Sequence, residues 1–316
     1  MSPNSWTCLH PSNATEAKLS LDNRGLAYGD GFFTTMGVID GQILWLDYHQ
    51  QRLVSHAAAL QLQLDSQSLL AMLKTHAKQL QQGMLKLIVT RAEQEVRGYG
   101  YTPNTGGSAC EIWFKSSPMA ITTAQSLPLA NNQFISLQPA ASAICLSSQI
   151  ACLPPPLAGL KSLNRLDNVL ASGELQAIKA KTLAGTIKPS IAEGLLRDMS
   201  GQWVEGTMSN VFYQLVEAPV AKSSNRPHSQ NNSNSNYLTQ GQWYTPSMAQ
   251  SGVAGVMRQV IIDTLSTSNN PVIIRSLQDE DLLHLSQLFF CNALRGIMPM
   301  SSLRLLSGEV VSFEAI

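Results

Sequence analysis

The stretch GLKSLNRLDNVLASGELQ, residues 159–176, places one lysine, Lys161, between a proline-rich approach (LPPPLAGL, 153–160) and leucines at helical spacing. Lysine is mostly exposed in folded proteins, so the ordinary interpretation of Lys161 is a solvated surface charge. The chemical alternative is an amine that condenses with an aldehyde. Such a lysine must be partly desolvated, because burial lowers its pKa and leaves the neutral amine available. This alternative requires partner residues elsewhere in the chain.

Glu205, in the stretch WVEGTMSNVF (203–212), is a candidate partner for the ring nitrogen of a bound heterocycle. A carboxylate beside a pyridine nitrogen keeps the ring protonated, and the protonated ring stabilises a carbanion formed next to the condensed amine. The alternative is a solvent-facing glutamate at a strand end, since glutamate is usually exposed.

A phosphate site is suggested by SGVAGVMRQ (251–259), where two glycines precede a predicted helix. A helix start offers free N–H groups and a positive dipole end to an anion, here from Gly255, Val256 and Met257. Arg52, in DYHQQRL, would add a planar donor fork. A tight loop and a surface arginine are the plain alternatives. Pyridoxal phosphate needs an amine, a ring-nitrogen carboxylate and a phosphate site, and all three have candidates here.

The elements that must position these residues fall into two units. The first third mixes helices and strands: a strand at 43–46, helices from Asp47 to about Leu60 and over 68–80, and strands at 83–91 and 109–115. A stretch rich in Ser, Thr and Pro at 116–132 predicts a connection. We therefore expect a small α/β domain at 1–124 and a larger domain at 125–316.

The second unit mixes strands with a few helices. We expect a helix after Lys161, with Leu163, Leu166 and Leu170 on its apolar face. Further predictions are a hairpin turning at 198–201, strands at 210–216, 271–277 and 287–293, helices at 256–265 and from 279, and a strand resuming at QWYTP (242–246). The Ser-, Asn- and Gln-rich residues 221–241 predict a flexible insertion between two hairpin strands.

Composition limits the function classes. The 316 residues carry equal numbers of basic and acidic side chains, 21 each, so no overall field favours nucleic acid or an anionic membrane. The five scattered cysteines predict free thiols and a reducing compartment, with no metal constellation. No apolar run reaches the roughly 18 residues of a membrane span, and the N-terminus lacks a signal pattern. We expect a cytoplasmic protein with a small-molecule partner.

Seven blocks stand in order along the chain: YGDGFFTT (28–35), HQQRL (49–53), VTRAEQEVRGY (89–99), GLKSLNRLDNVLA (159–171), WVEGTMSNVF (203–212), GVAGVMRQ (252–259) and FFCNALRGIMPM (289–300). Together they resemble the fold-type IV pyridoxal phosphate enzymes, the class IV aminotransferase family. The resemblance extends from about Leu21 to Pro299. The FFTT, LNRL and CNAL forms are most similar to the aminodeoxychorismate lyases, with D-amino-acid and branched-chain aminotransferases as cousins.

The resemblance implies a role for each residue of the cofactor site. Lys161 would bind the cofactor covalently, Glu205 would partner its pyridine nitrogen and Arg52 would bind its phosphate. The other implied phosphate contacts are Val256 and Met257 at the helix start and Asn292 and Ala293 in CNAL.

The resemblance also implies candidate residues for binding the substrate. Similar enzymes bind a carboxylate near the position of Arg97, and Tyr99 follows two residues on; both come from the small domain, from where they can reach the partner subunit's site. Phe33 and Thr35 alternate on a predicted strand, so we expect both to face the cofactor. Thr35 is expected to help protonate the departing group or to position a water.

The resemblance implies a two-domain α/β (α+β) enzyme whose larger domain contains a pseudo-barrel sheet. The expected reaction converts 4-amino-4-deoxychorismate to 4-aminobenzoate and pyruvate in folate biosynthesis, in a homodimer and without a metal. An aminotransferase of the same fold, acting on D-amino or branched-chain amino acids, would use the same cofactor residues. A non-catalytic dimeric binding module is the alternative from another class, and its sign would be a missing lysine or glutamate.

Overall fold

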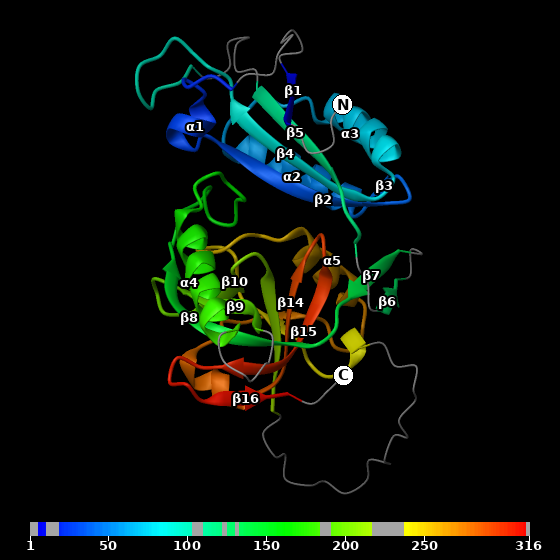
Figure 1. Ribbon diagram of the computed structural model, residues 1–316, viewed down its shortest axis with the longest axis vertical. Coiled ribbons are helices and arrows are strands. Elements are labelled where there is room, and N and C mark those ends of the chain that lie inside the picture. Colours follow the sequence, from blue (N-terminus) through cyan, green and yellow to red (C-terminus); the bar gives the residue numbers. More distant parts are fainter. Residues whose placement is uncertain are drawn as a thin grey trace, which may run out of the picture.

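The structure is a computed structural model, and it describes residues 6–10, 19–102, 110–121, 125–129, 133–183, 191–216 and 237–313. The strands of these residues form two sheets, one of five strands and one of eleven. Figure 1 shows the five-stranded sheet and its helices at one end of the long axis and the larger sheet at the other.

The smaller sheet is antiparallel throughout. Its strands, in spatial order, are β1 (Trp6–His10), β5 (Cys110–Pro118), β4 (Gly83–Arg91), β2 (Gly31–Ile39) and β3 (Gln42–Ile43). Successive side chains of a strand point to opposite faces, and the burial pattern follows this rule. Phe32 and Met36 are fully buried on one face of β2, whereas Phe33 and Thr35 are half-buried on the other.

Helices cover the buried face of this sheet. The long helices are α2 (Leu46–Ala59) and α3 (Ser66–Leu80), and the short helix α1 (Arg24–Tyr28) precedes β2. Leu53, Leu73 and Leu85 share one core cluster without exposed surface, and each buried leucine contributes about 1.5–3 kcal/mol of apolar burial. The strand predicted at 43–46 is shorter, since Trp45 adopts a left-handed backbone (φ 58°) and α2 begins at the next residue.

The larger sheet closes on itself through a ring of strands. The ring runs β8 (Ala141–Ile150), β9 (Ile191–Asp198), β10 (Trp203–Gly206), β11 (Asn210–Leu215), β14 (Leu285–Asn292) and β15 (Gly296–Arg304), and β15 pairs back to β8. One cluster takes Leu195, Tyr213, Phe290 and Met300 from four of these strands. The predicted mixed α/β fold with a pseudo-barrel is therefore confirmed.

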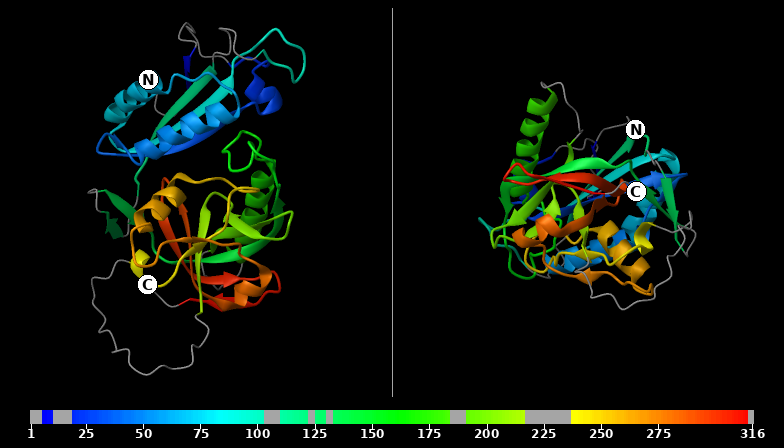
Figure 2. Two further views of the ribbon diagram at one scale, coloured as in Figure 1. Left: turned by 180° about the vertical axis from the view of Figure 1, so that it is seen from behind. Right: turned by 90° about the horizontal axis from the view of Figure 1, so that it is seen from below.

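Two helices pack outside the ring (Figure 2). α5 (Val256–Leu265) places Val260 and Ile261 in the cluster that contains Phe289 of β14, as predicted. α4 (Leu166–Leu183) packs through Ala171 and Leu175 against Leu146 of β8.

The predicted apolar face after Lys161 is wrong. Leu166 and Leu170 are 78% and 71% exposed, because α4 begins only at Leu166 and turns another face to the ring. Leu163 lies in the extended segment before the helix, where its N–H donates to Gly31 O. The leucine spacing fits a helical period, but the first leucine is not helical.

The remaining elements flank the ring. They are β6 (Gln125–Pro128), β7 (Phe134–Leu137), β12 (Tyr244–Thr245), β13 (Ile273–Ile274), β16 (Val310–Ser312) and the 3-10 turns η1 (Tyr237–Thr239) and η2 (Asp279–His284). β11 pairs with β12, as predicted for the strands on either side of the polar insertion.

Residues 221–236 of the predicted insertion lie outside the described residues. Its last five residues are described, and Tyr237 and Leu238 are buried in the cluster around Trp243 and Phe289, so the predicted segment extends too far. Their large apolar side chains explain this difference. The predicted domain boundary after residue 124 adjoins undescribed residues and stays a prediction. Within the described ranges, no helix is both long and apolar enough to span a membrane.

Candidate active site

Lys161 lies in an extended segment that is bonded to the small sheet and to the loop before α5. Its carbonyl accepts the N–H of Phe33 at 3.0 Å, and Ser162 forms a bridge with Phe32 of the small sheet. Two residues earlier, Gly159 O accepts the N–H of Ala254 at 2.9 Å, in the loop before α5. The segment can turn here because Gly159 has φ 76°, which a residue with a Cβ rarely adopts. Lys161 therefore sits at the junction of the two sheets.

The amine of Lys161 is in a basic and partly desolvated environment. Its Nζ lies 4.7 Å from the ring centroid of Phe33. Burial and, to a smaller extent, the positive charge of Arg52 lower the pKa of Lys161 to about 8, while Glu205 acts in the opposite direction. A substantial fraction of this amine is therefore neutral near physiological pH, as a nucleophile or a base requires.

Glu205 of β10 is 3% exposed and has few partners for a buried carboxylate. One oxygen, Oε2, accepts the N–H of Val253 at 2.8 Å, and Oε1 is 3.4 Å from Nδ2 of Asn168. Burial raises the pKa of Glu205, since a charged group loses its hydration there. A cationic N–H group beside Oε1 would offset that loss, so this carboxylate suits a protonated ring nitrogen.

Arg52 and the start of α5 are a candidate anion site. Arg52 projects from α2, is 8% exposed, and donates from Nη2 to Ala254 O at 2.7 Å. Burial lowers its pKa to about 10, which still leaves it charged at neutral pH. The helix cap, Gly255, makes no side-chain cap bond, and a Cβ there would lie 1.8 Å from Oδ1 of Asn210. Only glycine allows the chain to pass so closely, and the first N–H groups of α5 lack a capping side chain.

The loop of Asn292 and Ala293 adjoins this helix start. Oδ1 of Asn292 accepts the N–H groups of Leu294 and Arg295 at 3.1 and 2.9 Å, and Nδ2 is 3.5 Å from Met208 O. The Asn292 side chain thus shapes the loop. Ala293 packs against the cluster that includes α5. The structure therefore places Lys161, Glu205 and Arg52 close enough to interact electrostatically, and it packs Ala293 against the cluster that contains Val256 and Met257.

Three residues near Lys161 were missed by the sequence analysis. Arg165 has a buried Nε with no partner among the described atoms, and its charge acts on both Lys161 and Glu205. Lys86 of β4 holds its Nζ 5.4 Å from the ring of Phe33, opposite Thr35 in the strand register. His56 of α2 accepts the backbone N–H of Lys161 at 3.0 Å.

A weak signal for each of these residues exists in the sequence. Arg165 belongs to the LNRL form four residues after Lys161. Lys86 alternates with the buried Leu85 and Leu87, which assigns it to the open face of the sheet. His56 follows Arg52 by four residues, one helical turn.

Phe33 and Thr35 share the open face of β2 with Lys86, as predicted from their alternation. Thr34 points to the other face, where its Oγ1 lies 2.9 Å from Nδ1 of the buried His49. Of the two adjacent threonines, Thr35 is therefore the one on the side of Lys161.

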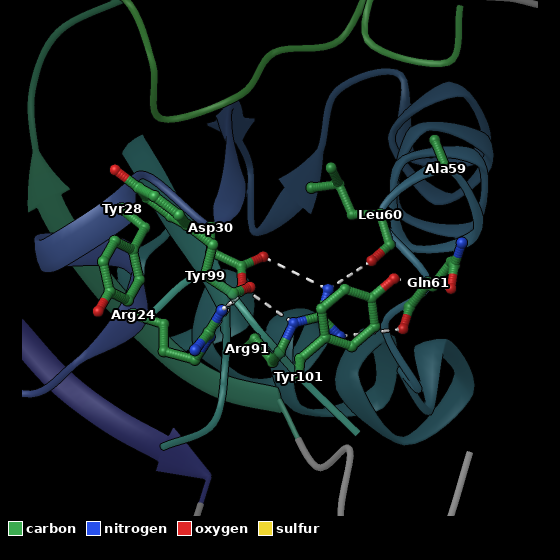
Figure 3. A pocket seen from close by; sticks show the side chains of 9 residues that line it. All are labelled: Arg24, Tyr28, Asp30, Ala59, Leu60, Gln61, Arg91, Tyr99 and Tyr101. Carbon is green, nitrogen blue, oxygen red and sulfur yellow. Dashed lines mark hydrogen bonds and ion pairs between the residues drawn. The ribbon is translucent and has the colours of Figure 1, made fainter. Parts of the chain in front are cut away.

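The structure does not bring Arg97 and Tyr99 to Lys161 of the same chain. Arg97 is exposed, and Tyr99 lines a cavity of about 290 Å³ on the small domain (Figure 3). There its ring packs edge-on against Tyr28 at 5.3 Å, and its carbonyl accepts Nη2 of Arg24 at 3.2 Å. Lys161 is absent from the residues that line this cavity, so both substrate assignments stay predictions.

The residues at the junction fit a flat phosphorylated heterocycle. Among the described residues whose charges shift the pKa of Lys161, three are cations, Arg52, Arg165 and Lys86, and one is a carboxylate, Glu205, which favours an anionic ligand. The orphaned Arg165 Nε, the uncapped start of α5 and the sparsely bonded Glu205 are the groups that such a ligand would satisfy.

Comparisons with known proteins agree with this fit. The family model described as amino-transferase class IV matches residues 31–303. An aminodeoxychorismate lyase of Vibrio harveyi is 23% identical over 91% of this chain and 88% of its own, and a putative branched-chain-amino-acid aminotransferase of Methanocaldococcus jannaschii is 27% identical over 95% and 87%. The crystal structure of 4-amino-4-deoxychorismate lyase from Pseudomonas aeruginosa has a TM-score of 0.68 and 29% identity, covering 95% of this chain and 91% of that one.

Proposed function

Because the chain belongs to the class IV aminotransferase family, we propose that it is a lyase that converts 4-amino-4-deoxychorismate to 4-aminobenzoate and pyruvate. Pyridoxal 5'-phosphate is its cofactor. The observation that carries the proposal is the position of Lys161, whose lowered pKa gives a reactive amine between the buried Glu205 and a second cation, Lys86. The similarity to lyases of Pseudomonas aeruginosa and Vibrio harveyi supports this reaction.

The cofactor would be held by the residues gathered at the junction. Lys161 would hold its aldehyde carbon, Glu205 its ring nitrogen, and Arg52 with the first N–H groups of α5 its phosphate. The loop of Asn292 and Ala293 would close the phosphate side. The bound cofactor supplies an electron sink for a carbanion beside the substrate's amine.

The protein's own residues would activate the substrate and move its protons. Nζ of Lys161 would take the hydrogen from the ring carbon that bears the amine, a role for which a pKa of about 8 suits it. The hydroxyl of Thr35 would deliver a proton toward the departing enolpyruvyl group or orient a water. Loss of that group makes the ring aromatic, so product formation is strongly favoured. A positioned acid or base contributes on the order of 100- to 10,000-fold.

The test is a pair of substrate assays on the cofactor-loaded protein. With 4-amino-4-deoxychorismate we expect 4-aminobenzoate and pyruvate in equal amounts. With D-alanine or a branched-chain amino acid and 2-oxoglutarate we expect little glutamate. Rapid transamination without 4-aminobenzoate would assign the chain to the aminotransferase alternative, which the Methanocaldococcus jannaschii relative represents.

Lys86 should bind a carboxylate of the dianionic substrate, because its ammonium lies on the open face beside Phe33. Replacing Lys86 by methionine should raise KM for 4-amino-4-deoxychorismate about 10- to 100-fold, as expected for one charge-assisted hydrogen bond of about 1.5–3 kcal/mol. Lys115→Met is the matched control, since Lys115 pairs with Lys86 across the sheet and is not among the charges that shift the pKa of Lys161. Equal KM values for the two variants would refute this role.

The lowered pKa of Lys161 predicts a distinctive labelling profile in the cofactor-free protein. Reductive alkylation by a small aldehyde requires the neutral amine, so labelling of Lys161 should rise with pH to a midpoint near 8. Exposed lysines should keep gaining label toward about pH 10. Peptide mass spectrometry measures both profiles in one sample. In Glu205→Gln the midpoint should move lower, because Glu205 raises the pKa of Lys161. A midpoint shared with the exposed lysines would contradict the proposal.

We also propose a cytoplasmic homodimer that acts in folate biosynthesis. In this arrangement Arg97 and Tyr99, which are exposed on their own chain, would contribute to the partner subunit's site. The loop that carries them is fixed by Arg24, which donates to the carbonyls of Gly98 and Tyr99.

A further inference from the structure

We propose that His56 is a positioning residue that fixes the backbone of Lys161 to helix α2 by accepting its N–H group. Its Nε2 lies 3.0 Å from the backbone nitrogen of Lys161. The proposal rests on Lys161 as the cofactor-binding lysine, an assignment that the lyase and the aminotransferase alternative share.

The surrounding hydrogen bonds define the tautomer of His56. The amide of Lys161 can only donate, so Nε2 must carry a lone pair and the ring proton must sit on Nδ1. Nδ1 lies 3.3 Å from Oγ of Ser55, which in turn donates to Arg52 O at 3.2 Å. A directional chain therefore leads from the amide of Lys161 through the imidazole and the hydroxyl to the carbonyl of Arg52.

Burial, together with the surrounding cations, keeps His56 neutral. Burial lowers its pKa to about 3, and the nearby cations Arg52, Arg165 and Lys161 act in the same direction. The ring packs against Phe32 of β2 in a T-shaped arrangement, with centroids 5.4 Å apart, and β2 (Gly31–Ile39) contains no acidic residue. Nε2 thus remains an acceptor wherever the enzyme is active.

The consequence is a fixed geometry between two parts of the cofactor site. Both backbone polar groups of Lys161 are held by the small domain: its N–H by His56 of α2 and its carbonyl by Phe33 of β2. Arg52 lies one turn before His56 on the same helix, so α2 sets the distance between the phosphate-binding guanidinium and the lysine. His56 acts through Lys161 and has no direct role in the chemistry.

The first test is NMR of the protein labelled with nitrogen-15 in histidine. We expect the His56 signals, identified by their loss in His56→Phe, to show a proton on Nδ1 and none on Nε2. They should not titrate between about pH 9 and about pH 5, although an ordinary histidine titrates near 6.5. A proton on Nε2, or titration near 6.5, would overturn the proposal.

The second test compares replacements that differ in where they place an acceptor. The side-chain oxygen of glutamine reaches about as far as Nε2, whereas that of asparagine reaches only as far as Nδ1. His56→Gln should bind the cofactor within about threefold of the wild type, while His56→Asn and His56→Phe should raise its dissociation constant about tenfold, the effect of one unpaired buried amide. Absorbance titration of the cofactor-free protein measures binding without any substrate.

His76→Phe is the matched control. His76 lies on the neighbouring helix α3 and packs on Phe114 of β5, so this variant should leave cofactor binding unchanged. Equal affinities of the glutamine and asparagine variants would refute the positioning role. Failure of the proposed reaction would appear separately, as absence of 4-aminobenzoate from a protein that still binds its cofactor through Lys161.

Discussion

The Lys161→Ala variant should lose at least about 10⁴-fold in kcat and should no longer show the absorbance band of cofactor joined to a lysine. Lys161 is proposed both to hold the cofactor and to move the substrate proton, so one replacement removes a nucleophile and a base. Because the amine is desolvated and lies among three other cations, alanine should leave the melting temperature of the cofactor-free protein unchanged or higher. Spectroscopy, turnover and thermal melting test the three expectations.

Lys86→Met is the control for that experiment. It removes a second amine beside Phe33 but should keep the lysine-bound absorbance band. If Lys161→Ala retains the band and Lys86→Met loses it, the two lysines have been assigned the wrong way round. Full turnover by Lys161→Ala would end the proposed mechanism.

Local patterns were sufficient to predict most of the elements. The alternation at 83–91 and the helical period at 256–265 match β4 and α5 to the residue, since each segment has one buried face. The leucines after Lys161 show where such patterns fail. Their spacing is helical, but the segment of Leu163 pairs with Gly31 of a strand more than 100 residues away, and no local period records that pairing.

The residues of the candidate site also divide into those that local sequence blocks predict and those that depend on long-range contacts. Lys161, Glu205 and Arg52 could be predicted because each lies in a block whose order along the chain resembles the family. Lys86 and His56 could not, because their positions depend on the β2–β4 register and on which face of α2 meets the lysine segment. These features are long-range, and one sequence contains no direct measure of them.

The polar insertion and the substrate residues show two further reasons why the sequence does not predict the whole structure. Tyr237 and Leu238 lie in a polar stretch, but their large side chains are buried in the cluster of Trp243 and Phe289. The average composition of the stretch therefore predicted the wrong end for the insertion. Arg97 and Tyr99 were assigned by resemblance, and both are exposed on this chain, so an assignment to the partner subunit's site depends on a second subunit.

Replacing Glu205 by glutamine should lower kcat about 100- to 1,000-fold, the range found when one preorganised electrostatic group is removed from an active site. Glutamine can keep the bond from the N–H of Val253, but it lacks the negative charge that would hold a proton on the ring nitrogen. The cofactor should still attach to Lys161, so the loss should appear in turnover and not in the lysine-bound absorbance. Unchanged kcat would show that Glu205 does not tune the cofactor.

Glu205→Gln should lower kcat but should not lower the stability of the cofactor-free protein. Burial raises the folded-state pKa of Glu205 above its ordinary value of 4.5, so the cofactor-free protein should lose stability as pH rises from about 4.5 through that raised pKa. Glu205→Gln should remove this decrease. The matched control is Glu193→Gln, because buried Glu193 accepts from Gly194, Thr207 and Ser209, and an amide would leave some of these donors unpaired. Thermal melts across this pH range should therefore show Glu193→Gln less stable and Glu205→Gln at least as stable as the wild type. A loss of stability in both would mean that Glu205 is a structural carboxylate, and the charge it offers to the ring nitrogen would need another explanation.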